Sequence, residues 1–150
     1  MWVQARNHMN DEQIQALYMD FLIEEGFRPK TDEEGDIIFK SEGRSVFIRI
    51  DPEDTEFLIL CCPNIWKCES EEDEIRGLAA AAYATASTKV AKVSIVTNYA
   101  WASVELFLPA PADFKAVLIR SLSAMHTAIR NFMDKIEEFH KEDEPFKSGE

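Results

Sequence analysis

Three consecutive segments rich in β-branched and aromatic residues constrain the fold of this chain most strongly. They are DIIFK (residues 36–40), SVFIRI (residues 45–50) and EFLILCC (residues 56–62), and the short linkers SEG and DPEDT lie between them. Such composition is typical of strands, and such linkers are typical of tight turns. A parallel crossover needs a dozen or more residues. The sequence therefore predicts that neighbouring strands are antiparallel.

One helix is predicted before these strands and another after them. In the first helix, Asn10 and Gln13 form a capping box, and Gly26 is the expected stop. Its apolar stripe consists of Ile14, Leu17, Tyr18, Phe21 and Leu22. The second helix begins at Ser70, and a stripe of mostly small residues is expected to pack closely on whatever the helix covers. That stripe consists of Ile75, Leu78, Ala79, Ala82, Tyr83 and Ala86.

Two further strands and a long helix are predicted in the rest of the chain. The strands VAKVSIVT (residues 90–97) and WASVELFLP (residues 101–109) alternate apolar and polar residues, which indicates one buried face and one exposed face. The helix is predicted over residues 114–139. Its apolar residues recur every three or four positions and are Leu122, Met125, Ile129, Phe132, Ile136 and Phe139.

The predicted order of elements is therefore α-β-β-β-α-β-β-α. This order favours an α+β fold with a five-stranded, mostly antiparallel sheet and three helices packed largely on one face. The 150 residues are expected to form a single domain. Residues 1–9 and 142–150 are expected to be flexible.

The chain is strongly acidic, with 28 acidic residues, 16 basic residues and a net charge of −12. Nucleic acids and anionic membrane surfaces attract basic proteins, so we expect neither as a partner. The first residues lack the apolar run of a signal peptide, and no segment is apolar for long enough to span a membrane. Together with the odd number of cysteines, these features favour a cytoplasmic protein.

The three cysteines lie within eight positions, which raises the question of a metal or redox site. Adjacent strand residues point to opposite faces, so Cys61 and Cys62 are not expected to bind one metal ion. The spacing to Cys68 also differs from the CxxC spacing of zinc sites, and the histidines are distant in sequence. A helix N-terminus would stabilise a Cys68 thiolate, but the surrounding acids oppose this. We expect small buried apolar residues here, and no metal and no cofactor.

No pattern of catalytic residues stands out in the sequence. The chain has no GxSxG motif and no glycine-rich phosphate loop. His126 lies beside the apolar stripe of the last helix, where a hydrogen-bonded or exposed histidine is the simplest interpretation. The acids occur in runs typical of solvated surfaces rather than in pocket pairs. We therefore expect no catalytic residue and a non-enzymatic protein.

Apolar residues also occupy strand positions that need not be buried. Trp101 and Phe107 lie on the polar side of one predicted strand, Val90 and Val96 share a predicted face on its neighbour, and the strand with Phe47 is largely apolar on both faces. If helices cover one face of the sheet, the other carries an apolar patch of the kind that marks partner surfaces. Alternatively, the last helix or a second copy of the chain covers that face. The candidate partner-binding residues are Trp101, Phe107, Val90, Val96 and Phe47.

The order of elements resembles the type III secretion chaperone-like fold, and more specifically the YbjN family of bacterial sensory transduction regulators. The most similar stretch is EEDEIRGLAAAAYATASTKVAKVSIVTNYAWASVELFLP (residues 71–109), and FKAVLIRSLSAMHTAIRNFMDKIEEFH (residues 114–140) continues it. The resemblance implies no catalytic activity and no cofactor. For secretion chaperones it implies acidic homodimers that hold an extended segment of another protein on apolar patches. It transfers no functional residue to this chain.

We therefore expect a non-enzymatic, homodimeric protein-binding module of the bacterial cytosol, chaperone-like or regulatory. It would hold a partner segment through apolar contacts, with strand addition at a sheet edge as one mode of binding. The alanine-lined second helix and the apolar stripe of the last helix are expected to form the dimer. The alternative is a regulator that senses a small molecule in a pocket between a helix and the sheet.

Overall fold

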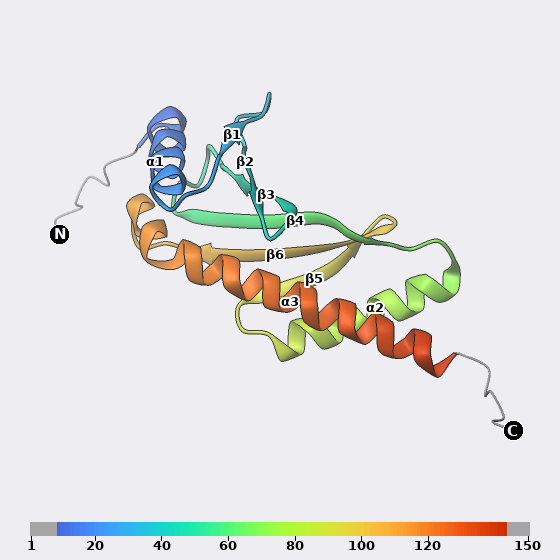
Figure 1. Ribbon diagram of the computed structural model, residues 1–150. Helices are drawn as coiled ribbons and strands as arrows, with labels where there is room; N and C mark the ends of the chain where they lie inside the picture. Colours follow the sequence, from blue (N-terminus) through green and yellow to red (C-terminus); the bar gives the residue numbers. More distant parts are fainter. Residues whose placement is uncertain (1–8, 144–150) are drawn as a thin grey trace, which may run out of the picture.

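The computed structural model describes residues 9–143, which form one antiparallel sheet and three α-helices (Figure 1). The helices are α1 (Asp11–Glu24), α2 (Glu71–Ser87) and α3 (Phe114–Glu142), and the short 3-10 helix η1 (Pro111–Asp113) leads into α3. The strands are β1 (Lys30–Thr31), β2 (Ile37–Ser41), β3 (Arg44–Arg49), β4 (Phe57–Lys67), β5 (Ala91–Val96) and β6 (Tyr99–Phe107). The predicted α+β fold with three helices is confirmed.

The ends of the chain were expected to be flexible, and most of those residues lie outside the described range. Among the described ones, Met9 packs against the core. Glu142 closes α3, and Asp143, its C-cap, forms an ion pair with Arg76 of α2. The last helix therefore extends beyond its predicted end at residue 139.

The sheet has six strands rather than the predicted five, in the order β1-β2-β3-β4-β6-β5, and every pair is antiparallel. The additional strand, β1, has only two exposed residues and pairs with β2 at Lys30 and Thr31. Two polar residues carry no strand pattern, so this strand arises from its pairing with β2 and not from a local preference.

The strand β4 runs further than the predicted segment, which ended at Cys62. Its pairing with β6 shifts between Cys62 and Trp66, and Asn64 has a positive φ of 54°. Proline is accommodated in a sheet mainly at edges and bulges, because it cannot donate a ladder hydrogen bond. This irregularity therefore accommodates Pro63 and allows the strand to continue to Lys67.

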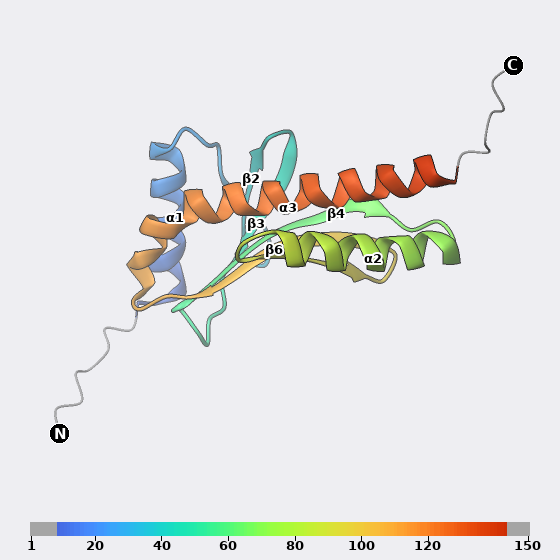
Figure 2. The same ribbon diagram turned by 90° about the horizontal axis from the view of Figure 1, so that it is seen from below.

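All three helices lie on one face of the sheet (Figures 1 and 2). Most strand residues that point to that face are buried, and they join buried residues of α1, α2 and α3 in one core. The helices α2 and α3 lie side by side and antiparallel, and α1 packs beside the start of α3, where Tyr18 stacks on Phe114. Because α3 lies on the same side as the other helices, it does not cover the opposite face.

The caps and the buried side of α1 agree with prediction. Asn10 and Gln13 form both hydrogen bonds of a capping box, and Gly26 follows the helix with a φ of 92°. The apolar stripe of α3 is buried in the core of its own chain, and only Phe139 at its end is partly exposed. The expectation that this stripe forms a dimer contact was therefore wrong.

The packing face of α2 was predicted incorrectly. The helix turns Gly77, Ala80, Ala81 and Ala84 towards the core, whereas all six residues of the predicted packing stripe are exposed. A Cβ atom on Gly77 would lie 2.8 Å from Trp66 Cζ3, so the absence of a side chain sets how closely α2 approaches the sheet. Small residues lie on several sides of α2 itself. The close approach at Gly77 therefore determines which of these sides is buried. We call Ile75, Leu78, Ala79, Ala82, Tyr83 and Ala86 the outer stripe of α2.

The outer edge of β5 is closed by a side chain of α2. The Thr85 hydroxyl accepts a hydrogen bond from the Val93 backbone N–H at 2.9 Å and donates one to the Val93 carbonyl at 3.3 Å. The Ala91 N–H is bonded to the Lys89 carbonyl at 2.7 Å. Unpaired edge strands recruit other strands, so these bonds protect β5 against strand addition.

Removal of the Thr85 hydroxyl is expected to destabilise the fold. In Thr85→Val, both Val93 backbone groups lose their partner, and we expect the free energy of unfolding to fall by about 1–3 kcal/mol. Thr85→Ser keeps the hydroxyl and should remain within about 0.5 kcal/mol of wild type. Urea unfolding followed by circular dichroism measures both, and equal losses in the two variants would show that the hydroxyl does not close the edge.

Candidate functional site

The face of the sheet opposite the helices carries apolar side chains, most of which are half-buried. We call this surface the open face and define its apolar part by Ile38, Phe47, Phe57, Ile59, Cys61, Trp101 and Phe107. Cross-strand pairing places these residues together, because Phe47 faces Cys61 and Phe57 faces Phe107. The Phe57 and Phe107 rings are 5.4 Å apart, and Phe107 is 84% exposed. Cys61 alone is buried, beneath its neighbours.

Four of the five predicted binding residues lie on this face. Trp101 and Phe107 are on β6, Phe47 is on β3, and Val96 lies at the end of β5 beside Tyr99. Val90 does not join them. It precedes β5 with a φ of 69° and lines a hollow on the helix side of the sheet. The sequence analysis extended the strand alternation one residue too far, because β5 begins at Ala91.

Ile38, Phe57 and Ile59 were not singled out from the sequence, although they also lie on the open face. Phe57 and Ile59 alternate with the buried residues Leu58 and Leu60. The predicted apolar character of this strand on both faces was therefore the signal for them. Core-facing neighbours along the strand identify each of these residues as part of the open face.

A hollow of about 260 Å³ lies in the open face. Its apolar lining comes from Phe47, Cys61, Pro63 and Trp101, and its polar lining from Asp32, Glu34, Asp36 and Arg49. The polar residues come from the β1–β2 loop and from β3. This hollow combines an aromatic surface with a cluster of carboxylates, whereas the acidic runs of the sequence, residues 32–34 among them, had been interpreted as solvated surface.

The charged groups around this hollow are only partly paired. The Asp36 carboxylate accepts a hydrogen bond from the Ile50 N–H, and it lies 3.9 Å from Arg49 Nε. Asp32 accepts two backbone hydrogen bonds within its own loop, from Glu34 and Asp36. Further along the open face, Lys92 Nζ lies 2.7 Å from Glu105 Oε2. The resulting surface offers acceptors at one side of an apolar patch.

The three cysteines lie in different environments. Cys61 points to the open face and Cys62 to the core, as their strand positions predicted. Burial raises the pKa of the Cys61 thiol to about 11 and also raises the pKa of Cys62. The pKa of Cys68 is raised by partial burial and by the Asp73 and Glu74 carboxylates. All three thiols are free and are held in the weakly nucleophilic, protonated form.

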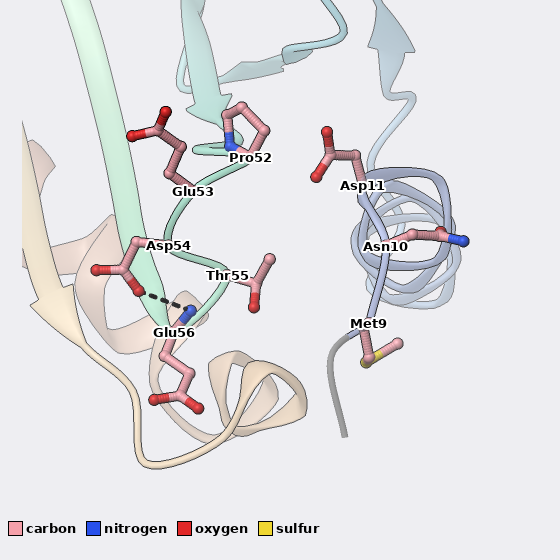
Figure 3. Close-up of a pocket in the computed structure, with 8 residues that line it drawn as sticks. All are labelled: Met9, Asn10, Asp11, Pro52, Glu53, Asp54, Thr55 and Glu56. Atoms are coloured by element: carbon pink, nitrogen blue, oxygen red, sulfur yellow. Dashed lines mark hydrogen bonds between the residues drawn. The ribbon is translucent and has the colours of Figure 1, made fainter. Parts of the chain in front are cut away.

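A larger hollow, of about 460 Å³, lies between the start of α1 and the loop from β3 to β4 (Figure 3). Its acidic side chains are those of Asp11, Glu53, Asp54 and Glu56, and Figure 3 shows their carboxylates pointing in different directions. Within residues 9–143, no three His, Cys, Asp or Glu side chains come together in a way that could hold a metal ion. We assign no chemistry to this hollow.

Ser41, His126 and Glu42 form a cluster that sequence reasoning missed. His126 Nε2 lies 2.8 Å from Ser41 Oγ, and His126 Nδ1 lies 3.5 Å from Glu42 Oε2. The same order of groups activates serine in hydrolases, where the hydroxyl must reach a substrate. Here Ser41 is 8% exposed and His126 is 5% exposed, and neither lines the hollow in the open face or the one beside α1. We interpret the cluster as a structural contact between β2 and α3.

His126 should make the stability of the fold depend on pH. Burial lowers its pKa below the ordinary value of 6.5, and the Glu42 carboxylate opposes this shift, while Arg130 and Arg44 reinforce it. The unfolded chain therefore binds the proton more readily than the native state. The His126 contribution is complete above about pH 6.5 and is lost as the pH falls towards the lower native pKa.

His126→Gln, which keeps a hydrogen-bonding group, is expected to flatten this dependence. Between pH 7 and pH 5, the free energy of unfolding should fall more steeply in wild type than in the variant, because only wild type takes up this proton. Denaturant unfolding across the pH range measures both slopes. Parallel profiles would exclude His126 as the titrating group.

No protein-family model matches the chain, and no curated protein matches its sequence. None of the helices within residues 9–143 combines the length and the apolar character needed to cross a membrane.

Proposed function

We propose that this chain is a non-enzymatic protein-binding module, chaperone-like or regulatory, that holds a segment of a partner protein on the open face. The observation that carries the proposal is the apolar surface formed by Phe107, which is exposed, and by Phe47 and Trp101, which are half-buried. Contiguous exposed apolar patches on a folded domain usually mark interaction sites. Aromatic side chains are also the residue type most enriched where binding energy concentrates.

The proposed mode of binding is side-chain contact across the open face rather than strand addition. Thr85 and Lys89 already occupy backbone groups at the outer edge of β5. At the other edge, β1 offers only two residues. Strand addition needs a row of free backbone groups, so both edges are poor templates for it.

The proposed partner segment is extended and apolar, with at least one basic side chain. The chain as a whole has a net charge of −12, and Asp32, Glu34 and Asp36 line the hollow beside Trp101. A lysine or arginine placed there would contact these carboxylates and also the aromatic ring of Trp101. Electrostatic complementarity of this kind favours basic segments over acidic ones.

We further propose that the module acts in the bacterial cytoplasm and belongs with YbjN-like, type III secretion chaperone-like proteins. What supports this is the order of the helices and of the longer strands, together with the acidity of the chain. The two-residue strand β1 is an addition to that order.

We also propose that the module is a homodimer formed through the outer stripe of α2. An antiparallel pair of α2 helices centred between Ala79 and Ala82 would place small residues together at the closest point. Large residues would then meet small or apolar ones. The contacts between the two copies would be Ala79 with Ala82, Leu78 with Tyr83, and Ile75 with Ala86. This isologous contact leaves the open face of each copy free.

Selection from a displayed library of random peptides tests the proposed surface and does not require that the partner be identified first. We expect selected peptides to be apolar with basic residues, and to lose at least about tenfold in affinity for Trp101→Ser/Phe107→Ser, because aromatic anchors dominate such contacts. Fluorescence anisotropy with a labelled peptide measures the affinity.

The matched control is Ile23→Ser/Ile119→Ser, which removes two exposed apolar side chains from the helix side of the molecule. This variant should bind as wild type does. Peptides that bind the open-face variant at full strength, or that lose affinity equally for both variants, would contradict the proposal.

A second candidate function, binding of a small molecule between a helix and the sheet, is favoured by one observation. A hollow of about 340 Å³ lies between α3, β6 and the loop before β5. It lies on the helix side of the sheet, so it is independent of the open face.

A further inference from the structure

The hollow beside α3 exists because two neighbouring elements stop short of it. The strand β5 begins at Ala91, opposite Val104, so Leu106 further along β6 has no neighbour on β5. The helix α2 ends at Ser87, so it does not continue alongside the first half of α3. Leu106, Val117 and Ala124 are consequently only partly buried around an open space of about 340 Å³. This size is sufficient for a small ligand.

The loop that borders this hollow is held in a strained conformation. Val90 has a φ of 69°, and the Ala91 N–H donates to the Lys89 carbonyl at 2.7 Å, which closes a γ-turn of the positive-φ type. A β-branched residue rarely adopts positive φ, and such strain is concentrated at ligand sites and switch regions. The turn is anchored from α3, where Asn131 Nδ2 donates to the Ser87 and Thr88 hydroxyls. Lys89 and Val90 are thereby fixed at the rim.

The rim is positively charged, although the chain is acidic. Lys89 and Arg120 line the hollow, and no carboxylate of the described residues does. Neither cation forms an ion pair or a side-chain hydrogen bond within the described part of the chain. Residues 114–130 of α3 include Lys115, Arg120 and Arg130 but no acid. An unpaired lysine and arginine above an apolar floor are complementary to an anion with an aliphatic body.

We propose that this hollow binds a free carboxylate with a short aliphatic chain. Lys89 and Arg120 would hold the carboxylate by charge-assisted hydrogen bonds, and Leu106, Val117 and Ala124 would cover the chain. Val90, at the strained turn, would contact the ligand from the side of the loop. The site uses none of the residues of the open face, so either proposal can fail without the other.

Titration with octanoate, followed by methyl resonances of Val90, Leu106 and Val117, tests the site. We expect saturable shifts of these methyl groups, and binding of octanoate at least about tenfold tighter than that of octylammonium, whose chain is the same and whose charge is opposite. Equal affinities for the two probes, or shifts confined to the open face, would overturn the proposal.

Two charge variants distinguish the effect of the cations at the rim from the effect of the overall charge of the molecule. Arg120→Glu is expected to weaken octanoate binding at least about tenfold, whereas Lys115→Glu, the same charge change outside the lining, should alter it less than about twofold. Equal weakening would overturn the role of the rim. Vesicles of phosphatidylglycerol should not displace octanoate, and displacement would identify a lipid surface as the anion and contradict a free carboxylate.

Val90→Gly tests the strained turn. Glycine adopts positive φ without steric cost, so we expect a higher melting temperature together with octanoate binding weakened at least about threefold, because the rim loses a fixed side chain. Unchanged octanoate affinity in this variant would show that Val90 does not contribute to the site.

Discussion

Phe132→Ala is expected to lower the free energy of unfolding by about 3–5 kcal/mol, the usual cost of truncating a buried aromatic residue. The Phe132 side chain is completely buried in α3, where its ring lies 5.8 Å from the Trp66 ring. Its loss leaves a cavity at the junction of the sheet, α2 and α3. Chemical unfolding of the purified protein measures the change.

Phe107→Ala provides the matched control, because the same atoms are removed from a side chain that is 84% exposed. We expect a loss of at most about 1 kcal/mol, from the contact with Phe57. Similar losses in the two variants would mean that the open face is covered in solution, by a second copy or by another part of the chain.

Ala82→Glu is expected to separate the proposed dimer. In the antiparallel pairing of two α2 helices, this position meets Ala79 of the second copy at the closest point. A carboxylate there would be buried without a partner, so the dissociation constant should rise at least about 100-fold. Light scattering should then give the mass of one chain, 17.2 kDa, in place of twice that value.

Ala116→Glu, the same change at an exposed position of α3, should leave the mass unchanged. The register has a separate test. Leu78→Lys should weaken the dimer, and adding Tyr83→Glu should restore part of it, because the two residues meet across the pair. A wild-type mass of one chain at micromolar concentration would contradict the dimer altogether.

The parts of the fold that the sequence predicted are those with local signals. Asn10 and Gln13 determine the start of α1 through their own side chains, and Glu42 and Gly43 form a two-residue turn with φ of 50° and 77°. Strand alternation placed Trp101 and Phe107 on the same side of one strand, whereas the position of Phe47 on that face follows from strand pairing. These features depend on residues close in sequence.

The errors came from features that distant residues determine. Small side chains surround much of α2, and its buried side is set by the close approach of Gly77 to Trp66. Ser41 and His126 meet although 85 positions separate them. The γ-turn at Val90 depends on where α2 ends and on Asn131 of α3. A single sequence without its tertiary contacts carries no signal for such arrangements.

Carbene footprinting of Phe47, Trp101 and Phe107, with and without a selected peptide, tests the central claim most directly. The claim is that the chain leaves one face of its sheet uncovered for a partner. It predicts strong labelling of these three residues in the free protein and protection when the peptide is bound. Weak labelling in the free protein, or labelling that the bound peptide leaves unchanged, would contradict it.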